Sequence, residues 1–263
     1  MQPKQSINDF VIKFANVNGT GSASANGMFA KAIFRMGIPV SPRNIFPSNI
    51  QGLPTWYEVR ISRDGYLGRR GGIDMMVSVN PQSFAKDVGE VEPGGYIIYD
   101  STKPLDLRHV RRDINYLGIP LTEMCLREYT DSRQRQLFKN VIYVGALAAL
   151  LNIDFAILKD LVGEQFKGKE KLITPNIHAL EVGHQYATTH FQCPLGIHLK
   201  AGEQTPKHIQ EFDQILMDGN TAAALGAVYA GATVAAWYPI TPSTSVVDAF
   251  EKYCQRLRID PGT

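Results

Sequence analysis

The apolar residues in the first half of the chain follow two alternating patterns, one typical of buried strands and one typical of helices. Residues 10–15 (FVIKFA) form a short apolar run that predicts a buried strand. Residues 25–36 then place apolar side chains at helical spacing, from Met28 to Met36, and Gly37 ends the helix. Further strands are expected at residues 56–61, 73–79, 96–99 and 119–126, with mostly extended chain over 37–54 and a short helix after Pro81. This order predicts a layered α/β domain with a mostly parallel sheet and right-handed connections.

The character of the sequence changes at residue 133. Residues 137–151 (LFKNVIYVGALAALL) have almost no polar face, which predicts a buried helix, and two more helices are expected at 155–166 and 175–189. We therefore divide the chain into an α/β domain over 1–200 with a helical segment at 133–190, a linker over 201–213, and the start of a second α/β element over 214–263. The helices of this second element are expected at 221–231 and 250–257. Since so short an element cannot build its own core, the chain is expected to be the N-terminal fragment of a longer protein.

The composition is that of an ordinary globular protein without a strong charge. Lys and Arg number 27 against 25 Asp and Glu, so no field draws the chain to nucleic acid or to a membrane surface. Cys125, Cys193 and Cys254 lie far apart in the sequence, which excludes a CxxC metal site and means that any iron–sulfur cluster must belong to another chain. The first residues lack the apolar run of a signal peptide, and no stretch approaches the ~20 apolar residues of a membrane span. A cytoplasmic protein is expected.

A glycine-containing loop follows the first predicted strand directly and opens the first helix. Its free N–H groups and the positive end of the helix dipole suit a phosphate or pyrophosphate. NAD is disfavoured, because Ser24 replaces the third glycine of the dinucleotide fingerprint and Ser41, Pro42 and Arg43 stand where the ribose-binding acid is expected. The alternative is a tight strand–helix turn with no ligand. The candidate phosphate-binding residues are Gly19, Thr20, Gly21 and Ser22.

Other polar groups favour simpler interpretations. Arg69 and Arg70 fit an exposed hairpin tip better than a phosphate clamp, and the arginines at 108, 111 and 112 are typical of a solvated surface. His178, His184 and His190 recur every six residues, so on a helix consecutive members point about 120° apart and cannot share a metal ion. No metal site is therefore expected in this chain. Cys125 and Cys254 are interpreted as core thiols.

The stretch from 219 to 244 is the most informative. Ala222, Gly226 and Ala230 repeat every four residues, which allows another backbone to approach closely. Downstream, Pro239 and Pro242 bracket Thr241, fix its backbone and remove two amide donors. A hydroxyl held in this way beside the free N–H groups of a helix start would suit a substrate carboxylate. The alternative is a capped loop in which Ser243 or Thr244 merely begins a helix, and the residues alone leave both interpretations open.

Two segments together resemble one family. The pattern Gly219-Asn, Gly226-Ala and Tyr238-Pro-Ile-Thr-Pro-Ser243 resembles the start of the pyrimidine-binding domain in the α subunit of 2-oxoacid:ferredoxin oxidoreductases. The upstream glycine loop, followed by residues 46–61, is similar to the γ domain of that family, and a γ domain fused ahead of the α domain is typical of its two-subunit members. The resemblance covers essentially the whole chain. It implies a γ domain over 1–200 and the truncated start of an α domain over 214–263.

The resemblance also implies an activity. Members oxidatively decarboxylate a 2-oxoacid with coenzyme A, using thiamine diphosphate with Mg²⁺, and reduce ferredoxin. A β subunit is expected as partner, sharing the thiamine diphosphate and Mg²⁺ site and carrying a 4Fe–4S cluster. Thr241 is implied as the contact to the substrate carboxylate, and the glycine loop as a ligand of coenzyme A. The implied substrate-binding residues are Tyr238, Pro239, Ile240, Thr241 and Ser243.

Two departures from the family pattern bear on these expectations. The glutamate that activates thiamine lies beyond Thr263, so the chain alone is expected to be inactive. The glycine loop also differs from the family's Gly-x-Gly-Gly-Gln-Gly. Fusion of γ ahead of α favours 2-oxoglutarate as substrate, by analogy of architecture alone. The competing interpretations are a non-catalytic phosphate- or nucleotide-binding subunit and a purely structural one.

Overall fold

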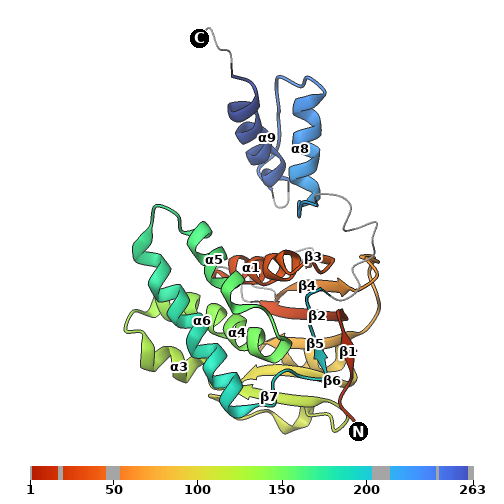
Figure 1. Cartoon of the computed structure of the whole chain (residues 1–263), viewed down its shortest axis with the longest axis vertical. Coiled ribbons are helices and arrows are strands. Elements are labelled where there is room, and N and C mark those ends of the chain that lie inside the picture. Colours follow the sequence, from red (N-terminus) through yellow and green to blue (C-terminus); the bar gives the residue numbers. More distant parts are fainter. Residues whose placement is uncertain (1, 17–19, 46–53, 203–213, 241–242, 260–263) are drawn as a thin grey trace. The chain divides into compact units, whose positions relative to one another are not determined.

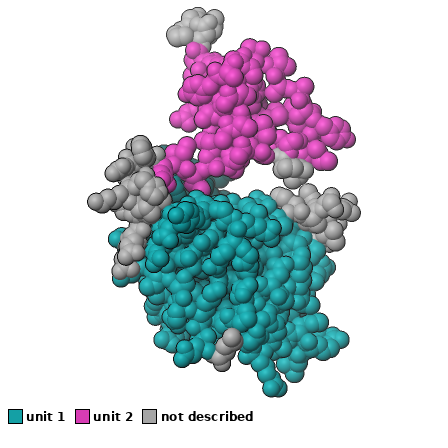
Figure 2. All heavy atoms as spheres, turned by 90° about the vertical axis from the view of Figure 1, so that its right-hand side faces the viewer, with its two compact units in different colours: residues 1–212 teal, residues 213–263 magenta. Residues whose placement is uncertain are grey.

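The computed structural model describes residues 2–16, 20–45, 54–202, 214–240 and 243–259. The chain divides into two compact units, Met1–Phe212 and Asp213–Thr263, which are coloured separately in Figure 2. Most of the predicted linker, residues 203–213, lies outside the described residues.

A six-stranded sheet forms the centre of the first unit (Figure 1). Its strand order is β3-β4-β2-β5-β6-β7, and β2, β5, β6 and β7 run parallel, whereas β4 is antiparallel to both of its neighbours. The sheet is thus mixed but mostly parallel, as the strand–helix alternation predicts. The strands are β2 (Asp9–Asn16), β3 (Val40–Ile45), β4 (Thr55–Ser62), β5 (Ile73–Ser78), β6 (Val91–Asp100) and β7 (Asn115–Ile119).

The side chains of β2 alternate between two hydrophobic clusters, one on each face of the sheet. Phe10, Ile12 and Phe14 belong to the larger cluster, with α1 (Ser22–Arg35) and α4 (Ser132–Leu151). Val11 points the other way and joins the smaller cluster, with α2 (Phe84–Glu90). Because successive residues of a strand face opposite sides, this one strand contributes apolar side chains to both layers.

One predicted strand is wrong. Ile119 ends β7, and most of the segment expected to be a strand at 119–126 is instead helix α3 (Leu121–Glu128). Pro120 precedes the helix, and its buried residues Leu121, Met124 and Cys125 recur at helical spacing. A short apolar run does not by itself distinguish a strand from a buried helix, so the helical spacing was the informative signal.

Helix α4 crosses α6 (Glu170–His190) so closely that only glycine fits at the crossing. A Cβ at Gly145 would lie 2.0 Å from the carbonyl oxygen of Leu180, and one at Gly183 would lie 1.9 Å from that of Ile142. The expected buried character of α4 is therefore reached through backbone-to-backbone contact as well as through apolar side chains. Helix α5 (Phe155–Gln165) lies between these two helices in the sequence.

The beginning and the end of the first unit are joined. Strand β1 (Ser6–Ile7) pairs in parallel with β8 (Ile197–His198). The side chain of Asn8 donates to the carbonyl oxygen of Lys200 at 2.8 Å and accepts from its N–H at 2.9 Å. A short 3₁₀ turn, η1 (Leu107–His109), connects β6 to β7.

The second unit contains α8 (Gly219–Tyr229) and α9 (Thr244–Leu257), and its described residues include no strand. Ala224 and Val228 are its only buried hydrophobic residues among those described. Tyr229, Val234 and Tyr238 each expose most of their surface. This unit therefore leaves most of its apolar side chains uncovered. In the described part of the chain, no helix is long and apolar enough to cross a membrane.

Candidate functional site

The carboxyl ends of the parallel strands meet at one edge of the sheet in the first unit. The helix after β2, α1, packs on one face, and the helix after β5, α2, packs on the other. The chain therefore turns to opposite sides between these neighbouring strands. In α/β proteins such a point opens a crevice where ligands bind. The loops after β2, β5, β6 and β7 together form this edge.

The predicted phosphate loop lies at this edge, at the start of α1. Gly19 lies outside the described residues. Gly21 has φ +76°, a left-handed backbone conformation that favours glycine. A Cβ there would also meet the end of the Leu137 side chain, which is partly exposed and can move. Thr20 is buried, and its carbonyl oxygen accepts a hydrogen bond of 2.7 Å from the side chain of Asn140. Ser22 is also buried.

What this loop exposes is backbone. Gly21, Ala23 and Ser24 are exposed, whereas the side chains of Thr20 and Ser22 pack inward. Helix α1 begins without a side-chain cap and without an acidic residue in its first turn. The positive end of its dipole is therefore not neutralised locally, which favours an anion.

Next along the edge, Asp100 at the end of β6 organises a polar cluster that the sequence analysis did not identify. Its carboxylate accepts hydrogen bonds from Oγ1 of Thr102 at 2.7 Å and from the hydroxyl of Thr122, and it pairs with Nζ of Lys139 at 3.0 Å. Burial by itself would raise the pKa of Asp100, but the hydrogen bonds from Thr122 and Thr102 and the charge of Lys139 outweigh it and lower the pKa. The carboxylate is therefore ionised at neutral pH.

A cavity of about 460 Å³ opens beside this cluster. Its walls come from the ends of β5 and β6 and from α4, so the cavity belongs to the same edge of the sheet. The hydroxyl of Ser78 in its wall donates to the buried carboxylate of Asp87 at 2.6 Å. Its main lining residues are Ser78, Val79, Phe84, Tyr99, Asp100, Thr102, Lys103, Leu105, Thr122 and Lys139.

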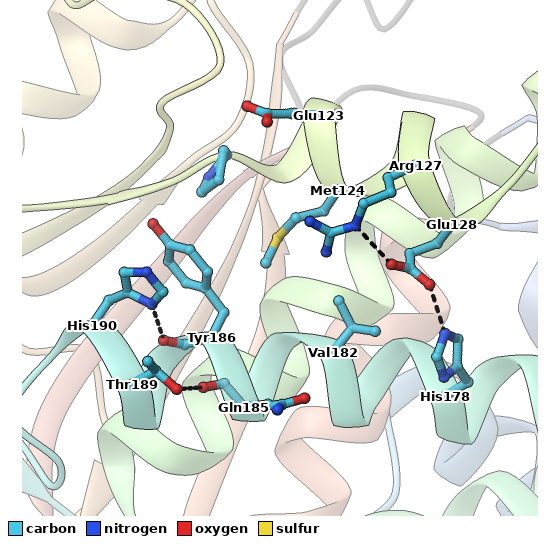
Figure 3. Close-up of a pocket in the computed structure, with 11 residues that line it drawn as sticks. Glu123, Met124, Arg127, Glu128, His178, Val182, Gln185, Tyr186, Thr189 and His190 are labelled. Atoms are coloured by element: carbon cyan, nitrogen blue, oxygen red, sulfur yellow. Dashed lines mark hydrogen bonds and ion pairs between the residues drawn. The ribbon is translucent and has the colours of Figure 1, made fainter.

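A second pocket, of about 570 Å³, lies between α3 and α6 (Figure 3). At one end, Oε2 of Glu128 pairs with Nε2 of His178 at 2.9 Å, and Oε1 accepts from Nε of Arg127 at 3.0 Å. These contacts, the one from His178 first, lower the pKa of Glu128. At the other end, Nδ1 of His190 lies 2.9 Å from the carbonyl oxygen of Tyr186, four residues earlier.

The three histidines of α6 have separate surroundings. His178 pairs with Glu128, His190 bonds to its own helix, and His184 packs on the ring of Phe155 with 4.8 Å between ring centroids. Burial lowers the pKa of His184. Among the described residues, no group of three or more His, Cys, Asp or Glu side chains is arranged to hold a metal ion.

The remaining arginines and cysteines take part in local contacts. Arg70 pairs with the buried Asp74, and Arg111 donates to the carbonyl oxygens of Val88 and Val91. Cys125 is buried, which raises the pKa of its thiol to about 11. Cys254, expected in a core, is only half-buried, because α9 has no buried residue.

The predicted substrate loop belongs to the second unit. Thr241 and Pro242 lie outside the described residues. Tyr238 and Ile240 are exposed to 78% and 60%, so their side chains are available to a ligand or to another chain. The hydroxyl of Ser243 donates to the carbonyl oxygen of Ile240 at 2.7 Å and lies 3.0 Å from that of Tyr238. The candidate residues around the glycine loop and those around Tyr238 thus belong to different units.

The fold is that of a known family. Residues 11–186 match the family described as pyruvate ferredoxin/flavodoxin oxidoreductase, which is more than half of the chain. The chain belongs to this family.

Among curated relatives, the chain is similar to 2-oxoacid:ferredoxin oxidoreductase 2, subunit alpha, of Aeropyrum pernix. The two are 24% identical over 93% of this chain and 43% of the relative. It is also similar to the 2-oxoglutarate oxidoreductase subunit KorA of Mycobacterium tuberculosis, at 23% identity over 95% of this chain and 42% of the relative. The chain thus spans less than half the length of these relatives.

Two solved structures share the fold. The 2-oxoglutarate:ferredoxin oxidoreductase of Magnetococcus marinus superposes with a TM-score of 0.79 and 24% identity, covering 96% of this chain and 42% of its own. That structure holds 2-oxoglutarate, coenzyme A and succinyl-CoA. The γ subunit of a keto/oxoacid ferredoxin oxidoreductase from Geobacter sulfurreducens superposes with a TM-score of 0.54 and 19% identity, covering 68% of this chain and 99% of its own.

Proposed function

We propose that the chain is the N-terminal part of a fused γ/α subunit of a 2-oxoacid:ferredoxin oxidoreductase. The observation that carries this proposal is a difference in coverage. A relative named as an α subunit aligns with 93% of the chain and KorA with 95% of it, whereas a separate γ subunit is covered almost completely by 68% of it. We assign residues 1–200 to the γ domain, 201–213 to the linker and 214–263 to the start of the α domain.

The reaction proposed for the whole enzyme is the oxidative decarboxylation of a 2-oxoacid with coenzyme A, which yields an acyl-CoA and CO₂ and reduces ferredoxin. Thiamine diphosphate, when bound with its Mg²⁺, supplies the carbanion chemistry. We assign the diphosphate site, the Mg²⁺ and the 4Fe–4S cluster to a β subunit. The enzyme is proposed to work in the cytoplasm.

Each unit of this chain has its own part in that proposal. Thr241 binds the substrate carboxylate, and the exposed Tyr238 and Ile240 line the same site. In the first unit, Gly21 and the uncapped start of α1 bind a phosphate group of coenzyme A through backbone N–H groups. Among the described residues, no side chain caps this helix terminus and no acidic residue lies in its first turn, which fits such a group.

We propose 2-oxoglutarate as the substrate. The support comes from the fused arrangement and from the names of two similar proteins, KorA and the Magnetococcus enzyme, both of which are described as acting on 2-oxoglutarate. Two competing functions remain: a phosphate-binding subunit, which predicts binding without turnover, and a structural subunit, which predicts neither.

The test begins with the natural polypeptide and the proteins that co-purify with it. We expect an iron-containing partner and CoA-dependent reduction of ferredoxin, faster with 2-oxoglutarate than with pyruvate or a branched-chain 2-oxoacid. Omission of coenzyme A from the same preparation is the control. Purification without an iron-containing partner, together with no reduction by any 2-oxoacid, would refute the enzymatic proposal, and coenzyme A binding would then separate a binding subunit from a structural one.

A further inference from the structure

Ser243 occupies the N-cap position of α9 but does not cap the helix. Serine at this position usually accepts a hydrogen bond from the N–H two or three residues later. Here the side chain makes no such bond. Its hydroxyl instead donates backward, to the carbonyl oxygen of Ile240 at 2.7 Å, and lies 3.0 Å from that of Tyr238.

Within the described part of the chain, the segment that receives these bonds makes few other backbone hydrogen bonds. Pro239 has no N–H to donate. The N–H of Ile240 donates to the carbonyl oxygen of Tyr238 at 2.8 Å, and the N–H of Ser243 donates to that of Ile240 at 2.8 Å. Since Tyr238 and Ile240 are largely exposed, packing does little to fix their backbone. The Ser243 hydroxyl is therefore a main restraint on the two carbonyl groups.

We propose that Ser243 is a positioning residue for the substrate site, which it serves by fixing the backbone of Tyr238–Ile240 rather than by touching the 2-oxoacid. This inference rests on the proposed function, which places these two side chains in the wall of the site. It specifies a different task for Ser243 from the substrate contact implied by the family resemblance. The Ser243 hydroxyl already donates its one proton to the carbonyl oxygen of Ile240, so it does not donate to a substrate carboxylate.

A neighbouring serine provides a matched control. The hydroxyl of Ser245 accepts a hydrogen bond of 2.7 Å from the side chain of Asn220 and so links the first turns of α8 and α9. It lies two residues after Ser243, in the first turn of the same helix, and is exposed. A change that affects only the helix start should appear in both variants, whereas a change in the loop should appear in Ser243→Ala alone.

The experiment uses the natural full-length subunit with its partner, as unmodified protein and as the variants Ser243→Ala, Ser243→Thr and Ser245→Ala. We expect Ser243→Ala to raise the KM for the 2-oxoacid about two- to tenfold, the effect of one lost hydrogen bond, with the KM for coenzyme A and kcat little changed. Threonine keeps the hydroxyl and should restore the KM, and Ser245→Ala should leave it unchanged. Amide hydrogen exchange at residues 240 and 243 should accelerate in Ser243→Ala only.

Several results would overturn the proposal. One is an unchanged 2-oxoacid KM in Ser243→Ala, and another is a Ser243→Thr variant as impaired as the alanine variant. Equal effects in Ser243→Ala and Ser245→Ala would assign Ser243 to helix stability. If the unmodified complex oxidises no 2-oxoacid, the proposed function fails, and the substrate role of Ser243 fails with it. Hydrogen exchange then still reports separately on whether the hydroxyl restrains the loop.

Discussion

Replacing Gly183 with alanine should destabilise the first unit, although alanine is the better helix former. Helix propensity alone would stabilise α6 by roughly 0.5–1 kcal/mol. The new Cβ, however, would lie 1.9 Å from the carbonyl oxygen of Ile142 and 2.9 Å from the amide nitrogen of Ala146. Both atoms belong to the backbone of α4, which cannot rotate away as a side chain can. Forcing the helices apart should cost about 3 kcal/mol, the upper end for overpacking. After the gain in helix propensity, the net loss is about 2–2.5 kcal/mol, which should lower the Tm by roughly 4–10 °C.

The assay is thermal unfolding followed by circular dichroism, with Gly163→Ala as the matched control. Gly163 lies in α5, and a Cβ there meets no atom within 4 Å. In the control variant, only the higher helix propensity of alanine should act, so its Tm should rise by a few degrees. The reasoning about the helix crossing is refuted if Gly183→Ala is as stable as the unmodified protein, or if the two variants shift the Tm in the same direction.

The other predictions concern the two candidate sites. Thr241→Val in the complete enzyme should raise the KM for the 2-oxoacid and lower kcat/KM by ~10-fold or more, and unchanged kinetics would remove its carboxylate role. Gly21→Ala should weaken coenzyme A binding, measured by calorimetry, because φ +76° is strained for alanine and the loop would have to change its backbone conformation; equal affinity would exclude this loop as the phosphate site. Asp100 has a lowered pKa when folded, so its stabilising contribution is present above its ordinary pKa, about 3.9, and is lost as the pH falls through the lower folded value. Asp100→Asn should therefore show a smaller drop in Tm between pH 6 and pH 3 than the unmodified protein, and an equal drop would contradict this.

Much of the fold could be predicted because each buried element carries its own periodicity. The strand at 10–15 and the helix at 137–151 are apolar over most of their length, and both were confirmed as β2 and α4. The direction of a strand, in contrast, has no hydrophobic pattern of its own in the sequence. The antiparallel pairing of β4 with β2 is set by its position in the sheet, and an apolar run reads the same in either direction. For the same reason, the apolar residues of α3 could be mistaken for a strand.

The site could be predicted only where its residues are neighbours in the sequence. The glycine loop and the Tyr238 loop are local, so their motifs are visible, although their ligands and roles stay predictions. The cluster of Asp100, Thr122 and Lys139 joins three elements that are separated along the chain. Asp100 at the end of a predicted strand was a usable signal for this cluster. Nothing in the sequence indicates that a lysine of α4 would pair with it.

The pairing of β1 with β8 has a consequence for how the two units could have become joined in one polypeptide. The first unit brings its two ends together through that strand pair and through the bonds between Asn8 and Lys200. A further domain can therefore follow it in the chain without changing the packing of its core. The same closure would let the unit exist as an independent polypeptide. If the two units are the γ and α parts proposed above, joining or separating their coding regions would change the number of chains that must associate during assembly. The architecture of the first unit would stay intact.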